Sequence, residues 1–578
     1  MICSPSKRFL RCLTLLCCVA PMGLYNQFHL LTGSHARTHT HTPRKLHKSR
    51  MCNAIEEYTV PVSCMTPRRL LLRTPECIRQ HAEAVSKFAA DQLRQYIMEG
   101  EDCLFTMLAG GKPEFVDGTL TFIDSLLEHH PGIDMPLLVL EEGQLPCKAL
   151  AENVRKRIRS RYNRTYFMKP LPKPGLYTNY VTLGNDSQTQ VKVFTGSGNK
   201  NMQLAFYDRL QLFTYTRCRS VVHVDAGDML VRKPFLSDML NGLRASPNAF
   251  QAPSLCTQSN YFNAGLFLVK APALGIETYE ALVNVTLMPP RASRFLDNVW
   301  FSDQDVMNVH FENFERLPYQ YNFNRRWSDQ RSCHDNASSV ADDAVLIHYI
   351  SSKPWTPRRS MPKRDKKKGS WEVDLFWWAA YARDKTIVVG AGPSVRGASG
   401  QVIDLFQNVI RLNSFVAEEG TRSATGLRTT YVFLHKATRP GNFQSIPATN
   451  IFLAPFGEGL RTIQRRMLRP SGTNLHLSEV SVLPSYYHEG LNWELEMTDN
   501  KHAMIGTIAV AWCLRNIDTR PIFVIGFDLM MAVNVTEYTH YDNSSTSVES
   551  LRKFHDIDAD RRYIKGLLKD GALKRLDW

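Results

Sequence analysis

The stretch TIVVGAGPSVRG, residues 386–397, decides how the second half of the chain is interpreted. A β-prone run leads directly into the turn GAG at 390–392, which is how the G-x-G-x-x-G fingerprint of a dinucleotide-binding strand–turn–helix unit begins. The third glycine is absent, because Val395 stands at its position, and no acidic residue occurs at the usual offset. The stretch therefore predicts a strand and a glycine turn in an α/β sheet, and disfavours a nicotinamide or flavin site. It leaves open a different nucleotide or none.

The chain has 578 residues, which is too long for one hydrophobic core. Its net charge of +15 is concentrated in two segments, because residues 1–50 carry +8 and residues 358–368 carry +6. The remainder is close to neutral. A nucleic-acid-binding protein carries its basic residues on a folded face, so we expect no nucleic-acid partner. The block 358–368 is expected to be an exposed loop. Three tryptophans after it (Trp371, Trp377 and Trp378) are expected to pack on the first domain.

The first 31 residues are interpreted as a signal peptide or a signal anchor. Basic residues precede the apolar run CLTLLCCVA, which is shorter than the ~20 residues of a membrane-spanning helix. An uncleaved leader would attach the chain to the membrane with its N-terminus in the cytoplasm. The alternative is a leader without structure, or a start at Met51. Residues 32–99 are predicted to be a basic stem and lead-in.

Six N-x-[ST] sequons support a secretory route. They begin at Asn163, Asn185, Asn284, Asn336, Asn534 and Asn543. We therefore expect the folded part to lie in the lumen of the endoplasmic reticulum or Golgi, as a type II membrane protein, or to be secreted if the leader is cleaved.

Strand and helix patterns alternate between residues 100 and 383. Strands are predicted at 103–111 and 135–143, and helices at 115–132 and 198–216. A further strand within 218–235, CRSVVHVDAGDMLVRKPF, ends in acidic residues and continues past them. Because α/β sheets place their chemistry at the carboxyl ends of strands, its two aspartates, Asp225 and Asp228, are candidate ligands of a divalent cation. The alternative is an acidic turn without a ligand.

Three later segments accompany the two aspartates in a fixed order. They are NYFNAGLFLVKAP (260–272), FSDQDVMNVHF (301–311) and AVLIHYISSKPW (344–355). With the aspartates, they resemble the glycogenin-like family 8 glycosyltransferases. The resemblance implies a GT-A fold over 100–383 and retaining transfer from a UDP-sugar with Mn²⁺ or another divalent metal. By this resemblance Asp225, Asp228 and His348 would bind the metal, and Lys353 would contact the diphosphate.

The same resemblance implies a donor-sugar pocket. Arg209 matches a family lysine near the donor sugar, and Thr106 is assigned to donor binding. Asn263, Asp303 and Gln304 would line the pocket, with Gln304 under the anomeric carbon, so that Asp303 and Gln304 are the catalytic candidates. The aspartate motif differs from the family's Asp-x-Asp, because Gly227 stands at the third position and the second carboxylate comes one residue later.

A second ordered set of motifs fills residues 384–578. It consists of VIRLNSF (409–415), IGTIAVAWCLRNIDTRPIFVIGFDLM (505–530), THYDNSS (539–545) and FHDIDADRRYIKGLLKDG (554–571). In this order and spacing the segments resemble the motifs of family 29 sialyltransferases. The resemblance implies a variant GT-A fold with a CMP-sugar at the glycine turn. The implied CMP-contacting residues are Gly390, Gly392, Ser394, Asn413 and His540.

His555 is the general base implied by this second resemblance, in an inverting transfer to an acceptor hydroxyl. Asp560 would orient the helix that follows. The alternative for His555 is a charged surface turn at a helix N-terminus. Together the motifs predict an α/β protein with two Rossmann-like nucleotide-sugar modules: a two-module glycosyltransferase acting on a glycan or glycoconjugate. The competing hypothesis is a glycan-binding or scaffold protein with one or both sites inactive.

Overall fold

The structure is a computed structural model, and the part of it that is described here begins at residue 75. It covers residues 75–108, 113–141, 152–169, 207–255, 258–287, 303–325, 340–350, 353–356, 370–397, 400–413, 422–435, 450–454, 480–483, 485–498, 501–531, 537–539 and 545–576. The chain divides into two compact units, 1–53 and 54–578, and all of these residues belong to the second. The leader 1–31, the basic block 358–368 and His540 lie outside the described residues.

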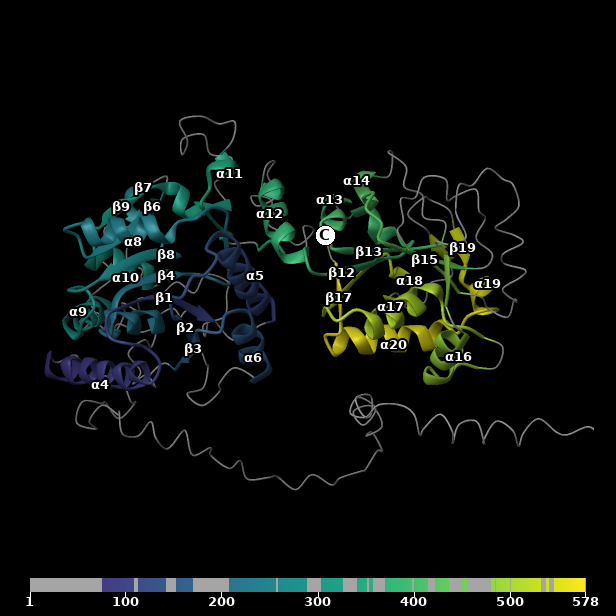
Figure 1. Ribbon diagram of the computed structural model, residues 1–578, viewed down its shortest axis with the longest axis horizontal. Coiled ribbons are helices and arrows are strands. Elements are labelled where there is room, and N and C mark those ends of the chain that lie inside the picture. Colours follow the sequence, from purple (N-terminus) through teal and green to yellow (C-terminus); the bar gives the residue numbers. More distant parts are fainter. Residues whose placement is uncertain are drawn as a thin grey trace, which may run out of the picture. The chain divides into compact units, whose positions relative to one another are not determined.

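The first α/β region is built on an eight-stranded sheet in the order β3-β2-β1-β4-β8-β6-β7, with β9 paired to β6 (Figure 1, purple to teal). Strands β3, β2, β1 and β4 are parallel, whereas β8, β6 and β7 pair antiparallel. The strands are β1 (Glu101–Leu108), β2 (Leu137–Glu141), β3 (Thr165–Met168), β4 (Cys218–Val224), β6 (Phe250–Leu255), β7 (Gln258–Phe262), β8 (Leu266–Lys270) and β9 (Glu315–Leu317). A three-stranded sheet adds β5 (Met229–Val231), β10 (Phe323–Asn324) and β11 (Leu346–His348).

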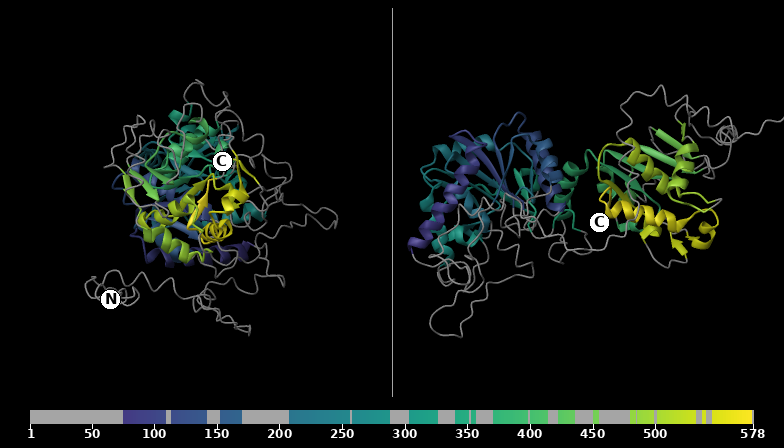
Figure 2. Two further views of the ribbon diagram at one scale, coloured as in Figure 1. Left: turned by 90° about the vertical axis from the view of Figure 1, so that its right-hand side faces the viewer. Right: turned by 90° about the horizontal axis from the view of Figure 1, so that it is seen from below.

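Helices cover both faces of this sheet. Successive side chains of a strand point to opposite faces, so each strand contributes to a core on either side. Cys103, Phe105 and Met107 of β1 join one core cluster, and Leu104 and Leu108 join the other. The first cluster contains α4 (Pro75–Arg94), η4 (Tyr207–Thr214), α9 (Ile276–Leu287) and α10 (Asp303–His310). The second contains α5 (Pro113–His129), α6 (Glu152–Arg161) and α8 (Leu236–Ala245). Figure 2 shows α4 and α5 on opposite sides of the strands. Short helices η6 (Tyr319–Asn322) and α11 (Val340–Asp343) lead into β10 and β11.

The second α/β region has a seven-stranded sheet that is entirely parallel, in the order β16-β15-β14-β13-β12-β17-β20 (Figure 1, green to yellow). Its strands are β12 (Thr386–Val389), β13 (Asn408–Leu412), β14 (Tyr431–His435), β15 (Asn450–Ala454), β16 (Val480–Val482), β17 (Ile522–Ile525) and β20 (Leu573–Arg575). The helices are α12 (Ser370–Ala382), η11 (Pro393–Gly397), α13 (Gly400–Asp404), α14 (Arg422–Thr425), α16 (Ser485–Glu494), α17 (Ile505–Asn516), α18 (Asp528–Met531), α19 (Val548–Arg552) and α20 (Ile557–Lys569). A small hairpin joins β18 (Glu537–Thr539) to β19 (Ser545–Ser547).

The expected fold class, α/β with two Rossmann-like regions, is confirmed. Two local expectations differ from the structure. The helix predicted at 198–216 is described only from 207, and there it is the 3₁₀ helix η4, which ends at Thr214. Residues 75–94, which were assigned to the lead-in, form helix α4, whose apolar side chains recur at helical spacing and enter the first core. None of the helices described in the structure is both long and apolar enough to cross a bilayer.

Trp377 and Trp378 of helix α12 pack as expected against the first region, whereas the side chain of Trp371 lies outside what the structure describes. The Trp377 ring lies 5.1 Å from that of Trp355, and Trp378 donates its indole N–H to the carbonyl of Pro354 at 3.2 Å. Trp378 also contacts Phe523 of the second sheet. Helix α12 therefore contributes to a core cluster with residues from both regions.

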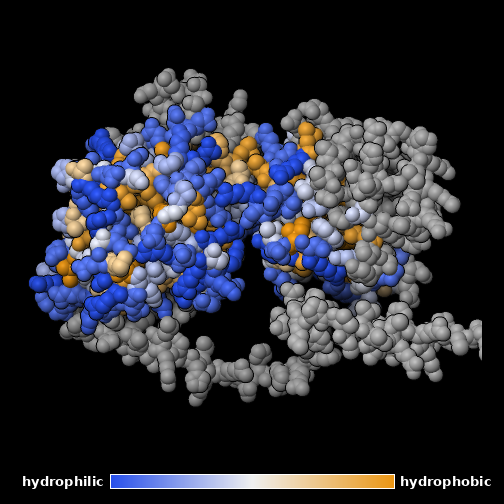
Figure 3. Space-filling view, viewed as in Figure 1, coloured by the Kyte–Doolittle hydropathy of each residue, from blue (hydrophilic) through white to orange (hydrophobic). Residues whose placement is uncertain are grey.

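A buried disulfide joins Cys103 of β1 to Cys218 of β4, which are neighbouring parallel strands. The face of the described surface in Figure 3 is mostly hydrophilic, with apolar residues in scattered groups. The large hydrophobic side chains that are exposed in the described residues are Tyr96, Met98, Trp493 and Phe554.

Candidate active site

The site lies where the connections of the first sheet change direction. The chain runs outward from β1 through β2 and β3 and then returns to β4 on the other side of β1. Open α/β sheets bind ligands in the crevice at the carboxyl ends of such strands. Asp225 directly follows β4, and the next residue, Ala226, donates its N–H to the hydroxyl of Thr106 in β1 at 3.1 Å. Thr106 thus holds the turn that carries the aspartates and is itself buried.

The turn 225–228 explains why the second carboxylate is displaced by one position. Asp228 donates its N–H to the carbonyl of Asp225 at 2.8 Å. Gly227 faces helix α5, because a Cβ there would lie 3.1 Å from the ring of Phe115. The backbone of Gly118 approaches the same turn so closely that its own Cβ would lie 2.1 Å from the Gly227 carbonyl oxygen. A side chain at 227 would point into helix α5, so residue 228 carries the second carboxylate.

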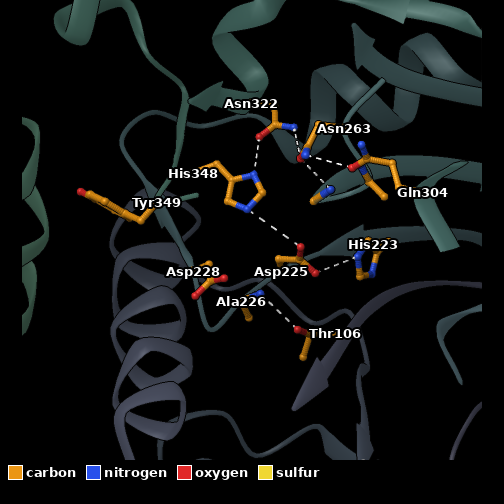
Figure 4. Close-up of polar contacts among 12 residues, drawn as sticks. Thr106, His223, Asp225, Ala226, Asp228, Asn263, Gln304, Asn322, His348 and Tyr349 are labelled. Carbon is orange, nitrogen blue, oxygen red and sulfur yellow. Dashed lines mark hydrogen bonds and ion pairs between the residues drawn. The ribbon is translucent and has the colours of Figure 1, made fainter. Parts of the chain in front are cut away.

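Asp225 is the centre of the polar cluster shown in Figure 4. Its Oδ1 lies 3.1 Å from the Arg209 guanidinium and 3.2 Å from Nε2 of His223, and its Oδ2 lies 3.9 Å from Nε2 of His348. Burial acts to raise the pKa of Asp225, but Arg209 and His223 outweigh it and hold this pKa well below its ordinary value. This shift favours the ionised form of Asp225.

Arg209 is held between two carboxylates. Its Nε lies 3.2 Å from Asp303, its Nη2 contacts Asp225, and its Nη1 donates to the carbonyl of Ala264 at 2.9 Å. The side chain is 4% exposed, so Arg209 orders the aspartates from inside the protein. Burial raises the pKa of Asp303 to about 6, although Arg209 opposes the shift.

His348 ends strand β11 and is almost fully buried. Burial lowers its pKa to about 3, so the imidazole is neutral at physiological pH. Its Nδ1 lies 2.9 Å from Oδ1 of Asn322, while its Nε2 faces Asp225. The ring lies against the backbone of Gly265, where an added Cβ would be 2.2 Å from Cε1 of His348.

Lys353 forms an ion pair with Oδ2 of Asp228 and donates to the carbonyl of Tyr349 at 2.9 Å. The other carboxylate oxygen of Asp228, Oδ1, is buried and has no hydrogen-bond partner within the described residues. Burial raises the pKa of Asp228, and Lys353 opposes the shift.

Asp225, Asp228 and His348 offer the kinds of ligand that a divalent metal requires. Suitable ligands of a divalent metal include an imidazole nitrogen without a proton, as in His348, and an ionised carboxylate, as in Asp225. The buried Oδ1 of Asp228, which has no hydrogen-bond partner within the described residues, is a third suitable ligand. Among the described residues, however, no group of three or more His, Cys, Asp or Glu has the spacing of an assembled metal site. The ligand types fit a metal, whereas Lys353 now holds part of the charge of Asp228.

The expected sugar-pocket residues are linked to His348 through amide side chains. Asn263 donates its Nδ2 hydrogen to Oε1 of Gln304 at 3.0 Å, and the N–H of Ala264 donates to the same oxygen at 2.9 Å. Asn322 donates to Oδ1 of Asn263 at 3.1 Å. Gln304 belongs to helix α10, which begins at Asp303. The structure thus brings Thr106, Arg209, Asp225, Asp228, Asn263, Asp303, Gln304, His348 and Lys353 into one neighbourhood.

The glycine turn of the second sheet lies at the corresponding change of direction, between β12 and β17. Three of its backbone N–H groups, those of Gly390, Gly392 and Ser394, are used within the protein. The N–H groups of Gly390 and Gly392 donate to the carbonyls of Ile525 and Gly526 at 2.7 and 2.9 Å. The N–H of Ser394 donates to a carboxylate oxygen of Asp528 at 2.9 Å. Gly390 is needed because its Cβ would lie 2.4 Å from the carbonyl oxygen of Gly526.

The remaining candidates of the second region lie near this sheet. Asn413 follows β13 in the left-handed conformation, with φ of 55°, and donates its N–H to the carbonyl of Phe433 at 2.8 Å. His555 is partly buried, and its Nδ1 lies 2.9 Å from the carbonyl oxygen of His502. A proton on Nδ1 leaves the lone pair on Nε2, as a general base requires. Burial lowers the pKa of His555.

Asp560 contacts the start of a helix that precedes it in the chain. It lies in helix α20 and accepts the N–H of Met504, at the start of α17, at 3.3 and 3.2 Å from its two oxygens. The carboxylate therefore caps a helix that precedes it in the chain. Burial raises the pKa of Asp560 to about 7.

Four residues of the first site were not found from the sequence. His223 contacts Asp225, Asn322 contacts His348, Tyr261 contacts Gln304, and Gly265 lies against the His348 ring. His223 and Gly265 lie within motifs already quoted, so a histidine two residues before the aspartate, in the same strand run, was a usable signal. Tyr261 also lies within a quoted motif, whereas Asn322 joins the site only through the tertiary fold.

Comparison with known proteins gives one family match. The model of glycosyl transferase family 8 matches residues 108–358. The segment contains nearly all of the first site, and the match supports a glycosyltransferase in this part of the chain. A comparison with curated proteins gives no match.

Solved structures of several glycosyltransferases are similar to parts of the chain. The galactosyltransferase LgtC, in complex with donor and acceptor sugar analogues, is 17% identical, with 48% of this chain and 95% of that chain covered and a TM-score of 0.31. Mouse xyloside xylosyltransferase 1 is 12% identical, with 45% and 100% covered and a TM-score of 0.31. A mammalian sialyltransferase is 17% identical, with 35% and 73% covered and a TM-score of 0.25. These values are too low to support an argument about activity.

Proposed function

We propose that the region from Glu101 to Thr356 is a retaining glycosyltransferase that transfers a sugar from a UDP-sugar with the help of a divalent metal. The observation that carries the proposal is the meeting of Asp225, Asp228, His348 and Lys353 at the switch point of the first sheet. The family match over the same residues supports it.

In this proposal the two aspartates and His348 would hold the cation, which would be Mn²⁺ or another divalent ion. Such a cation neutralises the charge that develops on a departing diphosphate. Lys353 would exchange Asp228 for an oxygen of the diphosphate, because a carboxylate and a diphosphate both offer anionic oxygens to its ammonium. Arg209 would keep Asp225 and Asp303 in place from inside the protein.

Gln304 and Asn263 would present amide groups to the donor sugar. The anomeric C–O bond to the diphosphate breaks, a new bond to the acceptor hydroxyl forms on the same face, and the hydroxyl proton leaves with the diphosphate. Retention therefore needs no strong base on the opposite face. The amide of Gln304 is held by Ala264 and Asn263, which favours a fixed dipole beneath the anomeric carbon.

For the second region we propose a sialyltransferase-like domain whose glycine turn does not hold nucleotide phosphate. What supports this is the use of the turn's N–H groups by Ile525, Gly526 and Asp528. An inverting transfer from a CMP-sugar with His555 as base remains the competing proposal, and the hydrogen bond from His555 to the His502 carbonyl is compatible with it.

We further propose that the folded part works in the lumen of the secretory pathway. The disulfide between Cys103 and Cys218 supports an oxidising compartment. Asn163, the first residue of a sequon, is exposed in the turn before β3. Protease protection of the full chain in microsomes, together with loss of mass on glycosidase treatment, tests this location.

The direct test of the first activity is hydrolysis of a panel of UDP-sugars by the full-length protein. We expect release of UDP with Mn²⁺ and none with a chelator, and no release from GDP-sugars. A protein that hydrolyses none of the panel, with or without metal, would favour the glycan-binding or scaffold alternative. That alternative draws its support from the ion pair between Lys353 and Asp228.

A further inference from the structure

A chain of side-chain hydrogen bonds connects His348 with the residues expected beneath the donor sugar. Nδ1 of His348 lies 2.9 Å from Oδ1 of Asn322, and Asn322 donates its Nδ2 hydrogen to Oδ1 of Asn263 at 3.1 Å. Asn263 in turn donates to Oε1 of Gln304 at 3.0 Å. Figure 4 shows these four side chains pointing toward one another in sequence.

The chain continues beyond Gln304 to a buried carboxylate. Gln304 donates its Nε2 hydrogen to the hydroxyl of Tyr261 at 2.9 Å, and Tyr261 donates its O–H to Asp305 at 2.7 Å. Asp305 is completely buried and Tyr261 nearly so. With Tyr261 donating to Asp305, the direction of donation runs from His348 toward Asp305.

Two backbone amides fix this direction independently. The N–H of Gly265 donates to Oδ1 of Asn263 at 3.0 Å, and the N–H of Ala264 donates to Oε1 of Gln304 at 2.9 Å. A backbone N–H can only donate, so each contact identifies which terminal atom of the amide is oxygen. Asn263 must then accept from Nδ2 of Asn322, and the oxygen of Asn322 must face His348.

This arrangement determines the tautomer of the His348 imidazole. The oxygen of Asn322 can only accept, so Nδ1 carries the single ring proton and Nε2 carries the lone pair. Nε2 faces Asp225 at 3.9 Å, and the Gly265 backbone lies beside the ring. A lone pair and a carboxylate that face each other across this distance form a pair of donors for a cation between them.

We propose that Asn322 is a positioning residue that fixes His348 as the Nδ1–H tautomer, with Nε2 presented toward Asp225 as a ligand, and that the amide chain ties this ligand to Gln304. The inference rests on the proposed function, because it assigns His348 a ligand. The residue that supports a metal-binding histidine from behind typically accounts for about 10- to 100-fold in metal affinity.

The first test measures Mn²⁺ affinity of the full-length protein without donor, by the loss of the free-ion electron paramagnetic resonance signal. We expect Asn322→Leu to weaken Mn²⁺ binding by about 10- to 100-fold. Asn322→Asp keeps an acceptor for Nδ1, and we expect it to restore binding to within a few-fold of the wild type. The matched control is Asn308→Leu, a fully buried amide that bonds to Phe262 and the Gln304 carbonyl. We expect Asn308→Leu to lower thermal stability by about as much as Asn322→Leu does. The protein that remains folded should bind Mn²⁺ with unchanged affinity.

A second measurement does not require the Asn322 variants to fold. Nitrogen chemical shifts of ¹⁵N-histidine-labelled protein, with the His348 signals identified by their absence in His348→Gln, report which ring nitrogen carries the proton. We expect protonated Nδ1 and unprotonated Nε2. The opposite tautomer, or equal Mn²⁺ affinity of the wild type and Asn322→Leu, would overturn the inference. If the wild type binds no Mn²⁺ at all, the metal part of the proposed function fails, and the nitrogen shifts still decide the role of Asn322.

Discussion

Nε2 of His348 lies 3.9 Å from Oδ2 of Asp225, although the two residues end strands of different sheets. The pairing of β5 with β11 accounts for this, because it sets His348 opposite Met229, the residue that follows Asp228. The turn 225–228 connects β4 to β5 and therefore delivers both aspartates to the histidine. Three candidate ligands meet through one turn and one short strand pair.

Replacing Asp225 with asparagine should abolish metal-dependent hydrolysis of the UDP-sugar. The amide that replaces the carboxylate has no charge to offer a cation, and the loss of Asp225 also leaves the buried guanidinium of Arg209 with fewer anionic partners. We expect a loss of at least about 100-fold in kcat/KM, which corresponds to roughly 3 kcal/mol. Release of UDP measured with and without Mn²⁺ gives the result.

The control for this substitution is Asp238→Asn, on the exposed face of helix α8. It removes the same charge at a distance from the turn and should leave activity unchanged. Full activity in Asp225→Asn, or activity that a chelator does not reduce, would contradict the metal assignment.

Gly118→Ala should disturb the site from helix α5. The new methyl group would lie 2.1 Å from the carbonyl oxygen of Gly227, so the turn 225–228 must move. Overpacking of this kind costs about 1–3 kcal/mol, partly offset by the better helix propensity of alanine. We expect the melting temperature to fall. Because the displaced turn carries the candidate ligands, we also expect hydrolysis of the UDP-sugar to fall by more than about tenfold.

Gly242→Ala, in helix α8, is the matched substitution. A Cβ there has no neighbour within 4 Å, so we expect unchanged activity and a stability gain of up to about 1 kcal/mol. Equal effects of the two substitutions would show that the close approach of Gly118 to the turn is not required.

The pH dependence of stability should contain a contribution from Asp560. Burial raises its pKa to about 7 in the folded protein, whereas an unfolded aspartate titrates near ~3.9. The folded state therefore keeps a proton that the unfolded chain loses, so this contribution to stability is present below about pH 4 and is lost as the pH rises to about 7. An asparagine side chain in its place cannot ionise and still offers an oxygen to the Met504 N–H.

We therefore expect Asp560→Asn to gain stability relative to the wild type as the pH rises, reaching roughly 4 kcal/mol at pH 8, because each unit between the folded and unfolded pKa values corresponds to about 1.36 kcal/mol. Denaturant unfolding at a series of pH values measures this difference, in which the contributions of other groups cancel. Parallel stability curves for the two proteins between pH 4 and pH 8 would show that Asp560 is ionised in the folded state throughout.

Much of the first site could be predicted because its residues stand where strands end. Asp225 closes β4 and His348 closes β11, and such positions are visible in a pattern of apolar runs followed by polar residues. The sequence shows that the second carboxylate, at 228, departs from the Asp-x-Asp spacing, but it does not show why. The cause lies in another element, because a Cβ at Gly227 would lie 3.1 Å from the ring of Phe115 in helix α5.

What could not be predicted depends on contacts between distant segments. Asn322 has no local pattern that marks it, and its role follows only from the position of Asn263 and His348 on either side. The partner of Cys103 is likewise set by the pairing of β1 with β4 rather than by cysteine spacing. Within the described part of the helix predicted at 198–216, residues 207–214 form a 3₁₀ helix, because apolar periodicity alone does not distinguish an α-helix from a 3₁₀ helix.

The second sheet yields the last prediction, which concerns CMP. Phosphate groups bind at glycine turns through free backbone N–H groups. Here Gly390 and Gly392 donate to Ile525 and Gly526, and Ser394 donates to the carboxylate of Asp528. A bound phosphate would have to break the last of these bonds and lie beside a negative charge. We expect the full-length protein to bind CMP with a Kd no tighter than about 1 mM, or about −4.1 kcal/mol.

Isothermal titration with CMP, in the presence of saturating UDP to occupy the first site, makes this measurement. The informative variant is Asp528→Asn, which keeps an oxygen for the Ser394 N–H and removes the charge. If the turn is the site and only the charge opposes the phosphate, affinity should rise by about tenfold, or about 1.4 kcal/mol. A wild-type Kd in the micromolar range would contradict the prediction and restore His555 as a candidate general base. Absence of CMP binding in both proteins would favour a structural or glycan-binding role for the second region. The N–H groups of its glycine turn would then serve only hydrogen bonds within the protein.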